Sequence, residues 1–418
     1  MSLFRPSSES SLHPSTSGES LSEAVLDTSS ARDDLPEQYR AHFDELRSGI
    51  LVFCHEFKIP VETLRSKEAF GAELNSKKIP PERMAHAVSL FARLEHLVTN
   101  KEPLLEKEEP LEYAERLYRL KEQYTAQVEL LKRVGILQEG AITGIDGEEY
   151  SVPTLEQIAQ RLYERRELLE TKQDQGFVKL LLVPFGMSLD TLIFTFKRFL
   201  LDYKQTHLAF GLDILEPLRI FEDYQRADIG DPPKIIYNPQ SFSLIEGYQG
   251  KTKTQILKEQ NQDLDSTSGW VIHLLQPSIP NDSHSKGFAS IPRKGKGKNH
   301  GQKKSRPDFE ANKSAVEYLS VFQEAKINPV SPYYGESGLT PEDWILTFMI
   351  HLTETGKPLD NYQDNDIESS TYLTRAFFQS STLVPYAFWA RAGRQVFFDY
   401  NLPDSPAISI GVRSSVII

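Results

Sequence analysis

The sequence predicts a multi-domain protein with mostly α-helical N-terminal and middle regions and an α+β C-terminal domain. Three observations support this fold class. The chain has 418 residues, more than one hydrophobic core ordinarily organises. Apolar residues recur at three- and four-residue spacing through much of residues 34–210, which is the period of a helix. After residue 268 the pattern changes to short apolar runs separated by turn residues, which is typical of strands.

The N-terminal part of the chain divides into a tail and a helical domain. Residues 1–33 are rich in Ser, Thr, Pro and acidic residues and nearly free of large apolar ones, so we expect a disordered tail. Residues 34–136 form the expected helical domain. Its first helix has one apolar face, formed by Tyr39, Phe43, Leu46, Ile50 and Phe53. A second helix is expected from Pro81, and a continuous third helix from about residue 110 to residue 134.

Residues 137–210 are predicted to be α+β and mostly helical. Residues 142–145 and 150–152, joined by an Asp-Gly turn, have the pattern of a β-hairpin. Thr154 and Gln157 form a capping-box pair before the next helix. Residues 177–183 are a candidate buried strand. Residues 211–267 contain several prolines and a polar run, so we expect an irregular linker and a domain boundary there.

The predicted C-terminal domain covers residues 268–418 and begins with a strand over 270–275. Helices are expected over 313–326 and from Thr340, where a capping hydroxyl, Pro341 and Asp343 are typical of a first turn. Further strands are expected over residues 372–378, 386–389, 395–400 and 412–418. The last segment is apolar on one face, so we expect the chain to end inside a sheet.

Composition excludes several classes of protein. The chain carries 47 Lys and Arg against 59 Asp and Glu, a net charge of −12, which does not fit a globally basic nucleic-acid binder. The single cysteine, Cys54, excludes an intramolecular disulfide and a cysteine-based zinc cluster. No signal peptide or membrane span is visible, so a cytoplasmic location is expected. No phosphate-loop, zinc-protease or hydrolase motif is present, and we expect no catalytic residues, no metal and no cofactor.

Two charged clusters are candidate ion contacts. Residues 293–306 hold seven basic residues and no acidic one. The possible anion contacts there are Arg293, Lys294, Lys296, Lys298, Lys303 and Lys304. Because no aromatic residues are interleaved, this segment is either a solvated loop or a contact for phosphates. The acidic group Asp360, Asp364, Asp366 and Glu368 lacks the glycine and the ligand spacing of an EF-hand, which favours a solvated loop over a calcium site.

Aromatic residues and arginines are concentrated between residues 386 and 400. These residue types dominate binding hot spots. Because side chains alternate between the two faces of a strand, they cannot all be buried on one face. The cluster is therefore either a two-sided core strand or a partly exposed binding surface, and composition leaves both possibilities open.

The C-terminal motifs resemble those of a known family. Residues 384–395 (VPYAFWARAGRQ), followed by Pro403 and the ending GVRSSV of residues 411–416, resemble the variable proteins of diversity-generating retroelements. The helix start over residues 338–344, and the Gly269-Trp270 strand with its basic loop, share this resemblance. It covers roughly residues 268–418. It implies a C-type-lectin-like fold, similar to formylglycine-generating enzymes, in which chosen surface residues are diversified for ligand binding.

The resemblance divides the C-terminal residues into a scaffold and a variable set. The scaffold would comprise Trp389, Arg391, Arg394, Gln395, Gly411 and Arg413. The variable, ligand-binding positions would be Phe388, Ala390, Ala392, Gly393, Phe397, Asp399, Tyr400, Asn401, Leu402, Asp404, Ser405, Pro406, Ala407, Ile408 and Ser409. This domain has no cysteine, so the resemblance does not extend to the cysteine-dependent catalysis of formylglycine-generating enzymes.

Two functions follow as hypotheses. The first is a non-enzymatic protein that presents a diversified surface to an unidentified protein or surface ligand. In this hypothesis the N-terminal helices act as a carrier or assembly domain. The alternative is a nucleic-acid-associated protein that uses the basic loop 293–306 and the helical region, which the acidic net charge disfavours.

Overall fold

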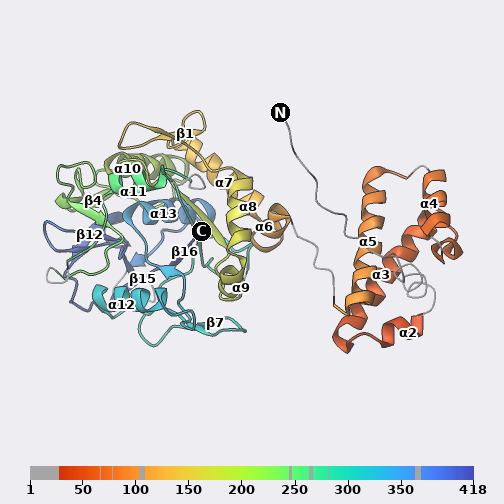
Figure 1. The fold of residues 1–418 in the computed structure, drawn as a ribbon. Helices are drawn as coiled ribbons and strands as arrows, with labels where there is room; N and C mark the ends of the chain where they lie inside the picture. The colour runs from red at the N-terminus through yellow and green to blue at the C-terminus, as the bar shows by residue number, and fades with distance from the viewer. Residues whose placement is uncertain are drawn as a thin grey trace, which may run out of the picture. The chain divides into compact units, whose positions relative to one another are not determined.

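The structure is a computed structural model that describes residues 28–65, 67–77, 79–102, 109–243, 247–262, 267–280, 282–362 and 369–418. The chain divides between residues 108 and 109 into an N-terminal unit and a larger second unit (Figure 1). Residues 1–27 of the expected disordered tail lie outside the described residues. The remaining part of that tail differs from the expectation, because it forms a short helix.

The N-terminal unit is built from helices, as the spacing of its apolar residues predicts. Its elements are α2 (Thr28–Asp33), α3 (Glu37–Glu56), the 3₁₀ helix η1 (Val61–Arg65), α4 (Lys67–Ser76) and α5 (Pro81–Asn100). Phe43, Leu46 and Ile50 of α3 are buried in the same core as Leu90 and Leu94 of α5. The apolar stripes of these two helices therefore face each other.

The second unit combines helices with several small antiparallel and mixed sheets, which confirms an α+β layout. Its helices are α6 (Pro110–Tyr118), α7 (Leu120–Arg133), α8 (Leu155–Glu164), α9 (Arg166–Asp174), α10 (Leu189–Thr206), the 3₁₀ helix η2 (Glu222–Tyr224), α11 (Lys253–Gln260), α12 (Ala315–Lys326) and α13 (Pro341–Thr355). Three two-stranded antiparallel pairs are formed by β1 (Ala141–Thr143) with β2 (Glu149–Ser151), β5 (Ile235–Tyr237) with β12 (Ala376–Phe378), and β7 (Asn299–His300) with β8 (Arg306–Pro307).

The largest sheet has the strand order β15-β11-β13-β14-β4, with β10 beside β13. Its strands are β4 (Leu218–Ile220), β10 (Asn361–Tyr362), β11 (Ser370–Tyr372), β13 (Val384–Ala390), β14 (Gln395–Asn401) and β15 (Ile410–Val412). Strands β13 and β14 form an antiparallel hairpin in which Phe388 lies opposite Phe397. Strand β4 pairs in parallel with β14, so a segment far away in the sequence extends the sheet beyond the hairpin.

A second sheet has the order β3-β6-β16-β9 and joins the middle of the chain to its end. Its strands are β3 (Lys179–Val183), β6 (Val271–Leu275), β9 (Glu336–Ser337) and β16 (Ser415–Ile417). Helix α7 covers the outer edge of β3. The Gln123 side chain bonds the Val178 carbonyl and the Leu180 amide, and Gln127 bonds the Leu180 carbonyl and the Leu182 amide, at 2.7 to 3.0 Å. These contacts satisfy backbone groups that an edge strand leaves unpaired.

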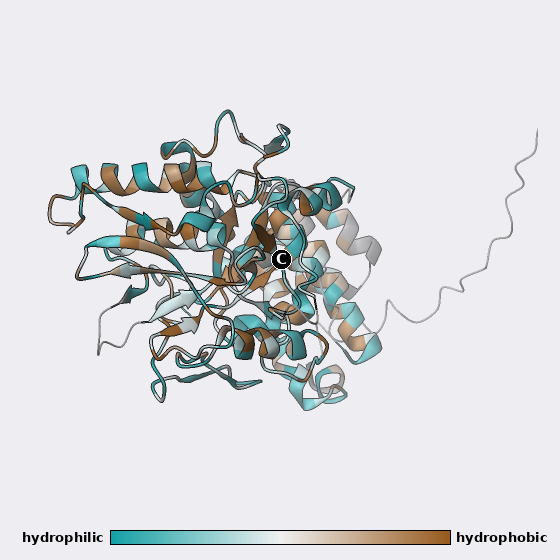
Figure 2. Cartoon of the chain, turned by 90° about the vertical axis from the view of Figure 1, so that its left-hand side faces the viewer, coloured by the Kyte–Doolittle hydropathy of each residue, from teal (hydrophilic) through white to brown (hydrophobic). Residues whose placement is uncertain are grey.

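One core connects the middle and C-terminal regions of the second unit. Phe196 of α10 contacts Trp344 and Phe348 of α13 and Phe398 of β14, with ring centroids 5.3 to 6.4 Å apart. The helices of this unit carry both hydrophobic and hydrophilic residues along their length (Figure 2). Their apolar sides therefore line a common interior.

The domain boundaries differ from the sequence prediction. Residues 109–136 belong to the second unit and not to a helical domain over 34–136. The region 137–210 supplies β3 to the sheet that contains β6 and β16. The segment 211–267, expected to be an irregular linker, supplies β4 and β5. The physical reason is strand pairing, because the strands of residues 268–418 find partners far upstream in the chain.

The local helix and hairpin signals are confirmed. Strands β1 and β2 pair across the predicted turn. Capping boxes are present at Thr154 with Gln157 and at Thr340 with Asp343. In each box the N-cap hydroxyl accepts a backbone N–H, and the partner side chain bonds back to the N-cap amide.

Three elements differ from their expected lengths. The strand expected over 372–378 is two strands, because a turn closed by the Ala376 amide and the Leu373 carbonyl separates β11 from β12, which lie in different sheets. The helix expected over 110–134 is broken at Arg119, which adopts a left-handed φ of 50° and separates α6 from α7. The strand expected over 412–418 is two strands. Between β15 and β16 the chain leaves the largest sheet at Arg413 and Ser414 and enters the second sheet.

Candidate functional site

The β13–β14 hairpin has two chemically different faces. The side chains that point into the core are buried, and they include Ala387, Trp389, Val396 and Phe398. The cross-strand pairs on the opposite face are half-buried, and they are Tyr386 with Asp399, Phe388 with Phe397, and Ala390 with Gln395. Because side chains alternate along each strand, the aromatic cluster is divided between core and surface. Both possibilities left open by composition therefore hold, for alternate residues.

A row of stacked aromatic rings lies on the outer face of the hairpin. Phe388 stacks on Phe397 with ring centroids 5.0 Å apart, and on Tyr386 at 5.8 Å. The Arg219 guanidinium of β4 lies 5.6 Å from the centre of the Phe397 ring, within cation–π range. The Tyr386 hydroxyl donates to Asp399 Oδ2 at 3.2 Å. The row therefore offers flat apolar area flanked by one cation and one carboxylate.

The segment that follows the hairpin is more exposed than this row. Tyr400 is 38% exposed, Leu402 57% and Ile408 74%. The Tyr400 ring packs on Phe221 with centroids 3.9 Å apart. Of the other expected variable positions, Asp404 and Pro406 are exposed, whereas Asn401, Ser405, Ala407 and Ser409 are half-buried. A groove of about 890 Å³ is lined by Leu402 of this segment and by Val316 of α12.

The tip of the hairpin lies at the surface. Arg391, Ala392 and Arg394 are exposed, and Gly393 is half-buried. Arg391 Nε donates to Asn361 Oδ1 at 3.1 Å. Arg394 has a left-handed φ of 52°, and its carbonyl accepts a hydrogen bond from the amide of Asp213 at 2.8 Å. Arg391 and Arg394, two of the three arginines that the resemblance assigns to the scaffold, therefore hold neighbouring segments from the surface, outside the core.

Three other expected scaffold residues are buried. The Trp389 ring packs on Phe210, with centroids 5.3 Å apart. Gly411 lies so close to Ile291 that a Cβ at this position would overlap the Ile291 side chain. Arg413 is also buried. These contacts give Trp389, Gly411 and Arg413 a packing role independent of any ligand.

Arg413 belongs to a buried polar cluster centred on Asp360. Arg413 Nη2 donates to Asp360 Oδ1 at 2.6 Å. The other carboxylate oxygen accepts a hydrogen bond from Trp344 Nε1 at 2.8 Å and a second from the Thr371 hydroxyl. The Asp360 carbonyl also accepts the amide of Trp389 at 3.0 Å. One residue thus connects α13, β11, β13 and the C-terminal segment.

These contacts give Asp360 a structural role. Asp364, Asp366 and Glu368, the other residues of the possible calcium loop, lie outside the described residues. Within the part of the chain that the structure describes, no group of three or more His, Cys, Asp or Glu residues could hold a metal ion.

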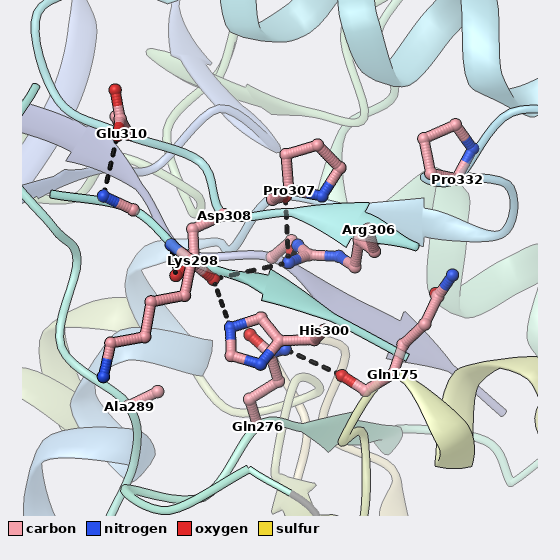
Figure 3. Close-up of polar contacts among 12 residues, drawn as sticks. Gln175, Gln276, Ala289, Lys298, His300, Arg306, Pro307, Asp308, Glu310 and Pro332 are labelled. Atoms are coloured by element: carbon pink, nitrogen blue, oxygen red, sulfur yellow. Dashed lines mark hydrogen bonds and ion pairs between the residues drawn. The ribbon is translucent and has the colours of Figure 1, made fainter. Parts of the chain in front are cut away.

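Two acidic residues that follow the basic loop 293–306, Asp308 and Glu310, bind its backbone and side chains. The Glu310 carboxylate accepts the amides of Gly295 and Gly297 at 2.8 and 2.7 Å, and these hydrogen bonds hold the pKa of Glu310 below its usual value. His300 and Arg306 both point toward the Asp308 carboxylate (Figure 3). Backbone donors that could cradle a phosphate are therefore already bound to the protein's own carboxylates.

The basic side chains of this loop have different surroundings. Lys294, Lys296, Lys298 and Lys303 are exposed. Lys304 donates to the Pro329 carbonyl at 2.8 Å, and Arg293 Nη1 donates to the Ile408 carbonyl at 3.2 Å. Only part of the expected anion contact is thus presented to solvent in the described loop.

Arg306 is a core residue. Its Nε and Nη2 donate to the two carboxylate oxygens of Glu336 at 2.8 and 2.7 Å, and Lys172 Nζ also lies 2.7 Å from Glu336 Oε1. Burial disfavours the charge on Glu336, but Arg306 and Lys172 outweigh this effect and lower the pKa of Glu336. Two buried cations therefore share the Glu336 carboxylate, and Arg306 Nη1 also lies 3.8 Å from Asp308 Oδ1.

A chain of Ser, His and Asp contacts also crosses the core. Ser415 Oγ lies 2.9 Å from His273 Nδ1, and His273 Nε2 lies 3.1 Å from Asp343 Oδ1. Serine hydrolases use the same three residue types. Here all three side chains are buried, so a substrate does not reach Ser415 in this conformation. Sequence analysis missed this cluster because its members are far apart in the chain and no local motif surrounds them.

A second buried cluster surrounds Lys253. Its Nζ lies 2.5 Å from Asp228 Oδ2 and 2.8 Å from Glu342 Oε1. The Tyr237 hydroxyl donates to the same Glu342 oxygen at 2.7 Å. Burial disfavours the charge on Lys253, but the two carboxylates outweigh it and raise the pKa of the ammonium group. The cluster ties α11 to α13 and to β5, and no sequence signal indicated it.

A cavity of about 360 Å³ lies among α9, α12 and β9. Leu168, Leu319 and Phe322 contribute apolar wall, and Arg165, Lys326 and Arg375 bring positive charge. Its lining residues come from positions between 165 and 417. No local sequence pattern could therefore have identified it.

Comparison of the chain with protein-family models, curated proteins and solved structures finds no match in any of the three. Among the described residues, every helix is too short or too polar to cross a bilayer.

Proposed function

We propose that the second unit is a non-enzymatic ligand-binding protein with a C-type-lectin-like scaffold. Its binding surface is the outer face of the β13–β14 hairpin together with residues 400–409. The proposal is supported by the resemblance of residues 268–418 to the variable proteins of diversity-generating retroelements. In this proposal, the positions that the resemblance marks as diversified form this surface.

The observation that carries the proposal is the separation of two residue sets along one short stretch of chain. Trp389 and Arg413 are buried, whereas Tyr400, Leu402 and Ile408 are exposed. Exposed apolar side chains that gather in one segment are typical of interfaces. Residues that do not carry the core tolerate substitution, which is what a diversified surface requires.

The chemistry of the surface fits recognition of a protein or another surface ligand. Phe388 and Phe397 supply rigid aromatic area that loses few rotamers on binding. Arg219 and Asp399 flank the row with opposite charges and supply directional contacts. The groove lined by Leu402 and Val316 adds a concave region to the proposed binding surface.

The DNA that flanks the coding region tests the diversification. We expect a near-copy of the final coding segment that differs mainly at adenines, together with a reverse-transcriptase gene. If neither is present, the diversification is disproved, while ligand binding by the hairpin still has to be judged by its own experiment.

Two matched libraries test the binding surface. One randomises Phe388, Phe397, Tyr400, Leu402 and Ile408, and the other randomises the same number of buried positions. We expect most members of the first library to fold, because the core is untouched, and to yield binders to a test protein such as lysozyme. We expect the second library to fold rarely. Equal fractions of folded members in the two libraries would contradict the proposal.

A further inference from the structure

We propose that the cavity among α9, α12 and β9 binds a small organic anion, a carboxylate or a phosphate ester with an apolar body. This site is separate from the hairpin surface, and the inference does not rest on the proposed function.

The wall of the cavity is electropositive. Arg165, Lys326 and Arg375 line it. The carboxylate in the lining is Glu336, and both of its oxygens are already bonded to buried cations behind the wall. The excess positive charge therefore faces the cavity and favours an anionic ligand.

Arg375 is held in position before any ligand arrives. Its Nε donates to Asn238 Oδ1 at 2.9 Å, and its Nη1 lies 3.3 Å from Asp343 Oδ2. In the described part of the chain its Nη2 makes no hydrogen bond. A guanidinium fixed on one side in this way has donors left for a planar carboxylate or a phosphate.

Arg165 is a partly buried cation at the wall of the cavity. It caps the C-terminus of α8 and donates to the Ile417 carbonyl. Burial lowers the pKa of its guanidinium, and within the described residues no carboxylate forms an ion pair with it. An anion in the cavity would supply the missing charge compensation.

Two buried hydroxyl groups lie at the wall of the cavity. Thr374 and Ser337 both line the cavity, and among the described residues neither hydroxyl oxygen makes a hydrogen bond. Thr374 is only 1% exposed. Burying a hydroxyl group without a partner costs free energy, so such groups beside a cavity point to a ligand that bonds them. Gly338 leaves room here, because a Cβ at this position would overlap the Thr374 hydroxyl.

The rest of the lining is apolar. Leu168 of α9 and Leu319 and Phe322 of α12 contribute apolar side chains to the wall. The volume of about 360 Å³ lies in the range of small-molecule sites, which combine an apolar lining with a few convergent polar groups. A ligand with both an anionic group and an apolar body satisfies both parts of this wall.

Calorimetric titration of the full chain tests the ligand class. The probes are phenyl phosphate, benzoate, inorganic phosphate and the uncharged benzyl alcohol. We expect the two aromatic anions to bind at least about tenfold more tightly than benzyl alcohol, because each makes charge-assisted hydrogen bonds. Inorganic phosphate should bind more weakly than phenyl phosphate, because it leaves the apolar wall uncovered. If phenyl phosphate binds more tightly than benzoate, the site is one for phosphate esters; if benzoate binds more tightly, it is one for carboxylates. Equal affinities for benzyl alcohol and both anions would overturn the proposal.

Variants then locate the binding site. Arg165→Gln and Lys326→Gln should each weaken binding of the preferred anion about tenfold. Arg166→Gln is the matched control, since it removes the same charge from the next residue, which lies outside the cavity lining. Gln323→Trp fills the cavity without changing its charge and should abolish binding. Wild-type affinity in Gln323→Trp, or an equal loss in Arg166→Gln, overturns the assignment.

Thermal melting of each variant separates lost binding from lost folding. Lys326 is exposed and Gln323 is half-buried, so both variants should melt close to the wild-type temperature. These two variants decide the question even if Arg165→Gln fails to fold.

Discussion

Arg413 Nη2 donates to Asp360 Oδ1 at 2.6 Å, and both side chains are buried. The pair connects the segment after β15 to the loop after α13. Trp344 and Thr371 bond the remaining carboxylate oxygen, so Asp360 is fully used by the protein. A buried ion pair of this kind holds a geometry in place, because each charge is costly to leave without the other.

Asp360→Asn should strongly destabilise the second unit. The substitution leaves the Arg413 charge buried without a counter-charge, and breaking such a pair costs about 3–5 kcal/mol. Urea unfolding followed by tryptophan fluorescence measures the loss. The protein's three tryptophans, Trp270, Trp344 and Trp389, all lie in the second unit and report on it selectively.

Asp399→Asn is the control for this experiment. Asp399 is half-buried, and its carboxylate accepts a hydrogen bond from Tyr386 on the outer face of the hairpin. Its substitution should cost no more than about 1 kcal/mol, because the partner remains free to bond the amide or water. Equal losses of unfolding free energy in the two variants would mean that the Asp360–Arg413 ion pair contributes no more than an ordinary surface hydrogen bond.

His351 should make the second unit sensitive to acid. Its Nδ1 accepts the amide of Phe288 at 3.0 Å, which requires the neutral imidazole. Burial lowers the pKa of His351 to about 3, assisted by the positive charges of Arg413, Lys179 and Lys357. The folded state therefore resists a proton that the unfolded chain takes up near its ordinary pKa of 6.5.

The sign of this effect is a loss of stability on acidification. Above pH 6.5 the imidazole is neutral in both the folded and the unfolded state, so the full contribution of His351 to the free energy of unfolding is present. Between that pH and about 3 the unfolded state binds the proton and the folded state does not, so stability falls by ~1.4 kcal/mol per pH unit. Compared with His351→Gln, the wild type should lose about 2 kcal/mol more between pH 7 and pH 5 in urea unfolding. Parallel pH profiles of the two proteins would show that His351 takes up its proton in the folded state.

Ser415 should not behave as a nucleophile. Its hydroxyl is buried against His273, so a fluorophosphonate probe should leave the folded protein unlabelled. Ser415→Ala should cost about 1 kcal/mol, the ordinary value of one buried hydrogen bond. Stoichiometric labelling that disappears in Ser415→Ala would instead establish a hydrolase-like site.

Cys54 reports on opening of the N-terminal unit. Burial raises the pKa of its thiol to about 11, and the side chain lies in the core with Phe53 and Leu94. At pH 8 the thiolate fraction should be about a hundredfold lower than for a free cysteine. Reaction with a disulfide reagent, followed by absorbance, should therefore be slow in the folded protein and fast in guanidinium. Equal rates would mean that the thiol is accessible in the folded unit.

Local features of this protein were predictable from its sequence because they are set by neighbouring residues. The Thr154 and Thr340 capping boxes and the β1–β2 hairpin are examples. The alternation that divides the aromatic residues of 386–400 between two faces is also local. It indicated that some rings are exposed, but it could not say which face meets the core.

The tertiary structure decided which segments belong together. Strand β4 pairs with β14 and β3 pairs with β6, so segments expected to be separate regions share one core. Sequence analysis could not find the contacts of Asp360 with Arg413 and of Ser415 with His273, because their members are far apart in the chain. The cavity lined by Arg165 and Arg375 was missed for the same reason. Turns, caps and face alternation depend on interactions within a few residues. Domain boundaries, buried charge pairs and cavities depend on strand pairing and burial between residues far apart in the chain, which only the folded structure brings together.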